Sequence, residues 1–286
     1  MPASAFELKL PERRTTCVVF SSPHSGRKYP ASFLRASILD QRTIRTSEDA
    51  FVDVLLEDVT GFGAPLISAI APRAFVDLNR AADELDPALV EGVRPIAHNP
   101  REASGLGVIP RVVAGGKAIY SGKLSRAEAE GRIEEWWRPY HDRLHALMED
   151  TRDAFGEAIL IDMHSMPHEA IDAMTVSGVR RPDVVIGDRF GAAAAPEIVG
   201  RIEAAFESAG LKVMRNSPFA GAYITQAYGR PGRRQHVVQV EIDRSLYMNE
   251  RDIRPNGNFQ GFRRLLSGVL SQIADIGRPE FRLAAE

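Results

Sequence analysis

The sequence predicts an α/β fold of three layers, with a mixed central sheet and helices on both of its faces. Two observations predict it. Short, nearly continuous apolar runs recur along the chain, and segments with the apolar period of an amphipathic helix lie between them. The 286 residues contain no internal repeat, low-complexity tract or Gly/Ser linker. We therefore expect residues 1–286 to form a single α/β domain.

Six runs rich in β-branched residues and bounded by turn residues are predicted to be strands. They cover residues 15–21, 65–70, 158–162, 183–187, 211–214 and 236–242. A further short strand is expected at Phe75 and Val76. Ligands of open α/β sheets bind beyond the carboxyl ends of the strands. The residues that follow each run are therefore candidates for a functional site.

Four segments have helical periodicity, namely residues 49–59, 125–155, 196–209 and 259–276. In the longest of them, Ser125 and Glu128 have the spacing of a capping box, which marks the start of a helix. Residues 81–121 differ, because they contain four prolines, many glycines and little periodicity. A loop of this length within a compact domain is more often functional than idle.

The composition limits the classes of partner. The 36 basic and 38 acidic residues give a formal net charge of −2, whereas a protein that coats nucleic acid is usually basic. No apolar stretch approaches the roughly 18 residues that span a bilayer, and we expect no secretory signal. The single cysteine, Cys17, lies in an apolar run and indicates a reduced core thiol. We expect a cytoplasmic protein that binds neither nucleic acid nor membrane.

Histidines and carboxylates follow the predicted strands. His24 and Asp77 follow two of them, and Asp162 and His164 stand at the end of a third. Zinc in hydrolytic sites takes three protein ligands drawn from His, Asp and Glu, and leaves a fourth position for water. A single histidine after a strand is more often a hydrogen-bonded structural residue. The coincidence of several such groups at strand ends is what favours a metal site.

A hydrolytic metal site also needs a carboxylate that is not a ligand, to take a proton from the water. Glu241 is the candidate, because it lies in the otherwise apolar run 236–242, where burial raises the pKa of a carboxyl group. The alternative is a structural ion pair of Glu241 with Arg244 or another arginine.

Arg80, beside Asn79, can bind a substrate carboxylate through its planar, bidentate guanidinium group. The alternative is a capping interaction or a salt bridge within the loop. A further group should stabilise the oxyanion that develops during hydrolysis. The candidates for it remain open; besides the metal they are His236, Arg230, Arg233 and Arg234.

A second pair of histidines has a spacing found in metal sites. His141 and His145 stand four residues apart in a predicted helix, as in zinc metalloproteases. Asp142 replaces the glutamate of those enzymes, and no third ligand follows at the expected distance. We therefore interpret both histidines as structural groups of the helix.

Six segments, taken in order, resemble the N-formylglutamate amidohydrolase family over roughly residues 17–250. They are Pro-His-Ser-Gly at 23–26, Ser-Glu-Asp-Ala-Phe-Val-Asp at 47–53, Phe-Val-Asp-Leu-Asn-Arg at 75–80, Asp-Met-His-Ser-Met at 162–166, Pro-Phe-Ala-Gly-Ala-Tyr at 218–223 and Gln-Val-Glu-Ile-Asp-Arg-Ser-Leu-Tyr-Met at 239–248. The resemblance implies a zinc-exopeptidase-like fold, similar to zinc carboxypeptidases and aspartoacylase. It also implies hydrolysis of N-formyl-L-glutamate to formate and glutamate in histidine breakdown.

The resemblance further implies roles for single residues. His24, His164 and one acid of the pair Glu48 and Asp49 would bind zinc, with Asp49 preferred, and Glu241 would be the general base. Asn79 and Arg80 would bind the substrate carboxylate. Tyr223 and His236 would lie in segments that line the pocket. Apart from the resemblance, another arginine, Arg73 or one of Arg230, Arg233 and Arg234, could recognise a γ-carboxylate, and a pocket without it would prefer a different N-acyl amino acid.

The predicted function is therefore that of a metal-dependent amidohydrolase. It would use Zn²⁺ to cleave the N-formyl or N-acyl amide of an acidic amino acid such as N-formyl-L-glutamate, a small-molecule substrate. One alternative is a hydrolase of the same fold that acts on a different small N-acyl amino acid or peptide. The other is a catalytically silent α/β protein that binds a carboxylate. The sequence does not predict an oligomeric state.

Overall fold

A computed structural model describes residues 4–94, 104–174 and 181–279. The chain divides into two compact units. One comprises residues 1–7, 23–50 and 68–143, and the other comprises residues 8–22, 51–67 and 144–286. The single domain that the sequence suggests stays a prediction.

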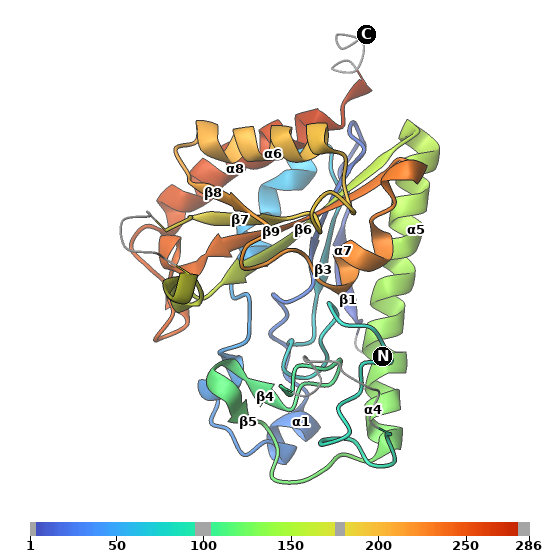
Figure 1. Cartoon of the computed structure of the whole chain (residues 1–286), viewed down its shortest axis with the longest axis vertical. Coiled ribbons are helices and arrows are strands. Elements are labelled where there is room, and N and C mark those ends of the chain that lie inside the picture. Colours follow the sequence, from blue (N-terminus) through green and yellow to red (C-terminus); the bar gives the residue numbers. More distant parts are fainter. Residues whose placement is uncertain (1–3, 95–103, 175–180, 280–286) are drawn as a thin grey trace. The chain divides into compact units, whose positions relative to one another are not determined.

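A seven-stranded mixed sheet forms the centre of the fold, as the sequence predicts (Figure 1). Its strand order is β1-β3-β2-β6-β9-β7-β8, formed by Phe6–Lys9 (β1), Leu66–Ala69 (β3), Val18–Ser22 (β2), Ala158–Met166 (β6), Gln235–Asp243 (β9), Val184–Gly187 (β7) and Val213–Arg215 (β8). Strands β2, β6 and β9 run parallel to one another, whereas β7 is antiparallel to β9. Strand β6 is buried along its whole length, which explains why its sequence is almost continuously apolar.

Helices cover both faces of this sheet. Figure 1 shows α6 (Pro196–Ser208) and α8 (Phe259–Ile276) packed together on one side, and α7 (Tyr223–Tyr228) on the other. The bounds of α8 are those predicted, and α6 ends one residue earlier than predicted. The apolar side chains that recur along α8 are buried, among them Phe262, Leu266, Val269 and Ile273. The three-layer α/β architecture is thus confirmed.

The unit that contains residues 68–143 holds shorter elements. They are α1 (Ala31–Ala36), a 3₁₀ helix (Thr43–Arg45), the antiparallel pair β4 (Val112–Val113) and β5 (Lys117–Ala118), a 3₁₀ turn between them (Ala114–Gly116), α4 (Arg126–Arg132) and a π-helical turn (Ile133–Trp137). The predicted cap of α4 is confirmed, because Ser125 Oγ accepts a hydrogen bond from the backbone N–H of Glu128. Of the long segment 81–121, residues 95–103 lie outside the described residues.

Helix α5 (Arg138–Phe155) continues directly from the π turn. The remaining elements are α2 (Val52–Leu55), β10 (Met248–Asn249), β11 (Arg254–Pro255) and the 3₁₀ helices Glu57–Phe62, His168–Met174, Pro231–Arg233 and Arg244–Leu246. Within the described ranges, no helix is both long and apolar enough to cross a membrane. Cys17 is fully buried, as expected of a core thiol.

Two expectations about the elements are wrong, and one strand was not expected. Phe75 and Val76 belong to no strand, because both of their N–H groups donate to the carbonyl of Pro72 in a turn instead of to a neighbouring strand. The single helix expected over residues 49–59 is instead α2 followed by the 3₁₀ helix Glu57–Phe62, and α2 begins only after Phe51, whose backbone is left-handed with φ of 69°. Strand β1 has no predicted counterpart, since its four residues are too few to give a pattern.

Candidate metal centre

His24 lies in the turn that follows β2 and is buried. Its Nε2 atom is 2.7 Å from Oδ1 of Asp77, and its Nδ1 atom is 3.5 Å from Oδ2 of Asp49. The backbone N–H of Asp49 donates to the carbonyl of His24 at 3.0 Å, which ties the two segments together. The structure therefore brings together the first predicted metal ligand and the preferred acid.

Glu48, the alternative acid, is engaged elsewhere. Its Oε1 atom accepts hydrogen bonds from the hydroxyl of Tyr29 at 2.6 Å and from Nε of Arg45 at 3.0 Å. Burial, reinforced by the Glu48 carboxylate, raises the pKa of the Tyr29 hydroxyl, so this group stays protonated and donates. Of the two acids, Asp49 is thus the one whose carboxylate faces His24.

Asp77 is an ionised carboxylate behind His24. Burial by itself raises the pKa of an aspartate, but the interactions with Arg73, His24 and Arg80, including the hydrogen bond from His24, together hold the pKa of Asp77 well below its usual value. Nε of Arg73 donates to Oδ2 of Asp77 at 2.9 Å. A carboxylate that accepts from Nε2 of an imidazole fixes the ring and leaves Nδ1 to act as the metal ligand.

His164 repeats this arrangement on β6. Its Nε2 atom is 3.0 Å from Oδ2 of Asp162, and Oδ1 of Asp162 accepts a hydrogen bond from Oγ of Ser21 at 2.7 Å. Asp162 and His164 lie two residues apart in one strand, so their side chains share a face of the sheet. Both histidines of the predicted ligand set are thus oriented by a buried aspartate.

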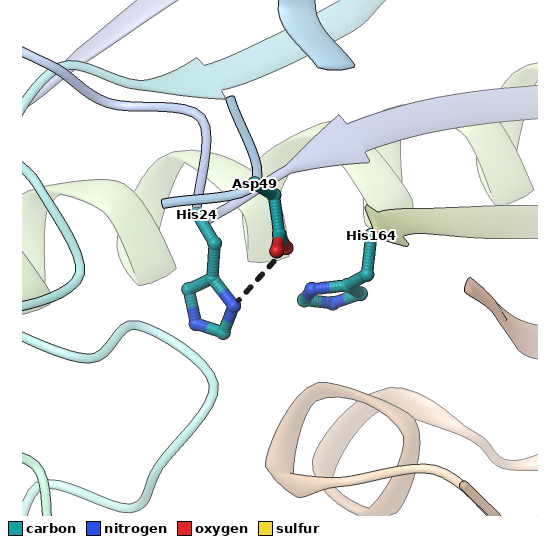
Figure 2. Close-up of side chains that lie close together, drawn as sticks. All are labelled: His24, Asp49 and His164. Carbon is teal, nitrogen blue, oxygen red and sulfur yellow. Dashed lines mark ion pairs between the residues drawn. The ribbon is translucent and has the colours of Figure 1, made fainter. Parts of the chain in front are cut away.

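His24, Asp49 and His164 form a group that can hold a metal ion. One ligand atom from each lies within 4.8 Å of the others, and all three residues are buried. Figure 2 shows the two rings and the carboxylate turned toward one another. Two imidazoles and one carboxylate are the ligand types of hydrolytic zinc sites. Because an aspartate also orients each imidazole, these residues fit a divalent metal ion.

Glu241 is the partner of His164 in the register of the parallel strands β6 and β9. Paired residues of adjacent strands point to the same face, so the two side chains lie next to each other. Oε1 of Glu241 accepts a hydrogen bond from Nε2 of Gln239 at 2.9 Å. Arg244, considered above as an ion-pair partner of Glu241, donates to Oγ of Ser165 at 3.1 Å.

Arg80 is buried in the unit that contains residues 68–143, and backbone carbonyls orient it. Its Nε donates to the carbonyl of Leu106 and its Nη1 to the carbonyl of Asn79, both at 2.9 Å. The backbone N–H of Asn79 in turn donates to Oδ1 of Asp77 at 2.8 Å. One short segment therefore carries the support of His24 and the predicted carboxylate-binding pair.

Residues 16–248 match the sequence family described as N-formylglutamate amidohydrolase. The chain belongs to this family. The amidohydrolase is 28% identical over 240 residues to the N-formylglutamate deformylase of Pseudomonas putida, with 82% of each chain covered. The deformylase of Pseudomonas aeruginosa is similar to the same extent.

Two solved structures resemble the amidohydrolase along nearly its whole length. A crystal structure of an N-formylglutamate amidohydrolase from Ralstonia eutropha JMP134 is 35% identical, with a TM-score of 0.89 over 96% of this chain and 99% of that chain. A gene product of Agrobacterium tumefaciens, only 17% identical, shares the fold with a TM-score of 0.63 over 95% and 97%. Family membership and the buried His-Asp-His group make the chain a hydrolase of the N-formylglutamate type.

Tyr223 is the first residue of α7 of the amidohydrolase, and two hydrogen bonds, through Ala222 and Gln239, connect its segment to Glu241. The backbone N–H of Ala222 donates to Oε1 of Gln239 at 3.0 Å, and the amide of Gln239 holds Glu241. The structure thus brings the Tyr223 segment to the carboxyl-terminal half of β9.

His236 and Arg230 do not lie near Glu241 at the carboxyl-terminal half of β9. His236 lies five residues before Glu241 on the opposite face of β9, about 16 Å away along the strand. Its Nε2 atom is 3.3 Å from Oε1 of Glu157. Nη1 of Arg230 donates to the carbonyl of Gln226 at 2.7 Å, at the end of α7. Both residues therefore stand at the amino-terminal end of β9.

The interpretation of His141 and His145 as structural groups is confirmed. His141 is buried, donates from Nε2 to the carbonyl of Leu78 at 2.9 Å and packs on the ring of Trp137. His145 is exposed, and its Nδ1 atom is 3.2 Å from a carboxylate oxygen of Glu149. Each of the two imidazoles thus has a partner that explains it.

The sequence analysis counts Asp77 and Asp162 among the carboxylates at strand ends, but it assigns neither them nor Gln239 the role of holding the candidate ligands and the candidate base. A signal exists for Asp162 and Gln239, because each stands two residues before its partner in a strand and so shares its face. No spacing identifies Asp77, which lies 53 residues from His24 along the chain.

Proposed function

We propose that the chain hydrolyses N-formyl-L-glutamate to formate and glutamate, with one Zn²⁺ ion held by His24, Asp49 and His164. The observation that supports this most is the buried group of two imidazoles and one carboxylate in a member of this family. The names of the two Pseudomonas relatives, N-formylglutamate deformylase, support the choice of substrate.

The proposal gives Glu241 the role of general base and then general acid. When bound, zinc supplies a water of lowered pKa and polarises the carbonyl that is attacked. Glu241 accepts a proton from the attacking water and donates it to the amine nitrogen of the departing glutamate. The hydrogen bond from Gln239 to Oε1 holds the carboxylate in place for both transfers.

Arg80 and Asn79 bind the α-carboxylate of the substrate in this proposal. A charge-assisted, bidentate contact gives both affinity and direction, which positions the formyl group for attack. Tyr223, which follows the residue bound to Gln239, is proposed to line the pocket. The positions of His236 and Arg230 at the other end of β9 do not support a role in the pocket.

Metal analysis and formate release from the purified chain test the proposal. We expect one zinc ion per chain, and faster formate release from N-formyl-L-glutamate than from N-formyl-L-leucine or N-formyl-L-alanine. The His164→Ala variant should lose both metal and turnover. The matched control His145→Ala, which removes an exposed histidine, should keep both.

Three outcomes contradict the proposal in different ways. Faster turnover of another N-acyl amino acid would reassign the substrate within the same chemistry. Metal binding without turnover of any substrate in the panel would indicate a catalytically silent protein. Full turnover by metal-free protein would show that the reaction does not need the metal.

A further inference from the structure

Residues 75–80 carry Asp77 and the pair Asn79 and Arg80, yet they form no strand. Buried backbone carbonyls need hydrogen-bond donors, and a segment outside a sheet must find them elsewhere. Here side chains of the helical run 126–155 supply three of them. The first is Arg132, which donates from Nη1 to the carbonyl of Phe75 at 3.2 Å.

Trp137 and His141 supply the other two, on either side of Asn79. Nε1 of Trp137 donates to the carbonyl of Arg80, and Nε2 of His141 donates to the carbonyl of Leu78, each at 2.9 Å. Both side chains are buried, and their ring centres lie 4.0 Å apart. The two donors are therefore packed against each other and cannot move independently.

The π-helical turn Ile133–Trp137 sets the position of Trp137 in this pair. A π turn contains one residue more than an α-helical turn, so it changes the direction in which the residues after it point. Such turns are rare in proteins overall, and those that occur are often found at functional sites. In this helix the residues before the turn include Arg132, and those that end or follow it are Trp137 and His141.

The direction of the Arg80 guanidinium depends on this backbone. Nη1 of Arg80 donates to the carbonyl of Asn79, and Nε donates to the carbonyl of Leu106. The carbonyl of Asn79 lies in the peptide group between the two whose carbonyls His141 and Trp137 hold, so a rotation of these neighbours would move this acceptor and turn the guanidinium plane.

We propose that Trp137 and His141 are positioning residues of the substrate-carboxylate site. By holding the carbonyls on either side of Asn79, they fix the direction in which Arg80 presents its guanidinium group to the α-carboxylate. The inference rests on the function proposed above, in which Arg80 binds that carboxylate. Neither residue touches the substrate.

The test compares two substrates that differ only at the group Arg80 would bind. They are N-formyl-L-glutamate and its α-carboxamide, which cannot pair with an arginine through two oxygens. Trp137→Phe and His141→Leu remove the two donors and keep apolar volume. His141→Gln keeps an N–H donor near the position of Nε2, and His145→Leu is the control from the exposed side of the same helix.

We expect the KM for N-formyl-L-glutamate to rise about fivefold in Trp137→Phe and in His141→Leu, the effect of one lost hydrogen bond, with little change in kcat. Kinetics with the α-carboxamide should match those of the unchanged chain. His141→Gln should restore most of the KM, and His145→Leu should leave it unchanged.

Equal losses with both substrates would overturn the inference, because they would show that the two side chains only support the fold. Unchanged KM values in both variants would overturn it as well. Metal content and the temperature of unfolding are measured for every variant. If they reveal a folding defect in Trp137→Phe or in His141→Leu, the variant without the defect decides.

An Arg80→Gln variant separates a failure of this inference from a failure of the proposed function. If the unchanged chain and Arg80→Gln prefer the acid over the carboxamide equally, Arg80 does not bind the carboxylate and the proposed function is wrong at that point.

Discussion

An aspartate stands behind each imidazole of the candidate metal centre, Asp77 behind His24 and Asp162 behind His164. Such partners orient the ring and raise its basicity, so they tune a metal site without touching the ion. The ligand types of the site could be predicted from the sequence. The support of His24 could not, since Asp77 lies 53 residues away along the chain and leaves no local pattern, whereas Asp162 stands two residues before His164 in one strand.

Glu241→Gln separates metal binding from catalysis. The amide cannot accept the proton of the attacking water, so we expect kcat to fall by a factor of about 10² to 10⁴ while the zinc content stays the same. Formate release and metal analysis measure the two quantities. Glu157→Gln is the matched control and should keep its turnover, because Glu157 directly precedes β6 and contacts His236 at the amino-terminal end of β9. Unchanged kcat in Glu241→Gln would show that another group is the base.

Asp162→Asn tests the support of His164. The amide is a poorer acceptor for Nε2 of the imidazole, and we expect the affinity for zinc to fall about 10- to 100-fold. Competition with a chelator measures it. Ser21→Ala removes only the hydrogen bond to the other oxygen of Asp162 and should have a smaller effect. An affinity equal to that of the unchanged chain in Asp162→Asn would exclude the supporting role.

The turn after β2 holds His24 through a close approach of two backbone segments. A Cβ atom added to Gly26 would overlap the carbonyl oxygen of Ala71, whereas one added to Gly61 would meet nothing within 4 Å. We expect Gly26→Ala to lower the free energy of unfolding by about 1–3 kcal/mol and to weaken zinc binding, because the turn that carries His24 must shift.

Urea unfolding and metal analysis check this expectation, with Gly61→Ala as the control that should change neither quantity by much. A Gly26→Ala variant with unchanged stability would show that the segment at Ala71 yields without cost.

Elements with a long periodic pattern could be predicted well. Helix α8 has the predicted bounds because a stripe of apolar residues recurs over eighteen positions, and no local feature competes with it. Residues 75 and 76 are apolar but do not form a strand, because both of their N–H groups donate to Pro72 in a turn and the carbonyl of Phe75 accepts from a helix more than fifty residues later. The left-handed backbone of Phe51 could not be predicted either, since phenylalanine is not a residue type that favours a positive φ.

Metal removal should lower the stability of the whole chain. A ligand that binds only the folded state stabilises it by RT ln(1 + [L]/Kd), which is about 2.7 kcal/mol when free zinc exceeds Kd a hundredfold. We therefore expect the free energy of unfolding to rise with zinc concentration and to fall when a chelator is added. Urea unfolding at several zinc concentrations measures it. In His164→Ala the dependence should vanish, and its persistence there would place the stabilising ion elsewhere.

The π-helical turn Ile133–Trp137 makes the chain sensitive to length at that point. Deleting one residue there would let the helix become regular; because the π turn absorbs one extra residue, the residues before and after it would keep their faces, whereas those within the turn would be repositioned. Leu144 and Leu147 would therefore stay buried, and the change would fall on the turn itself, which ends at the donor Trp137. Relatives with this function should therefore vary in the identity of these five residues more readily than in their number.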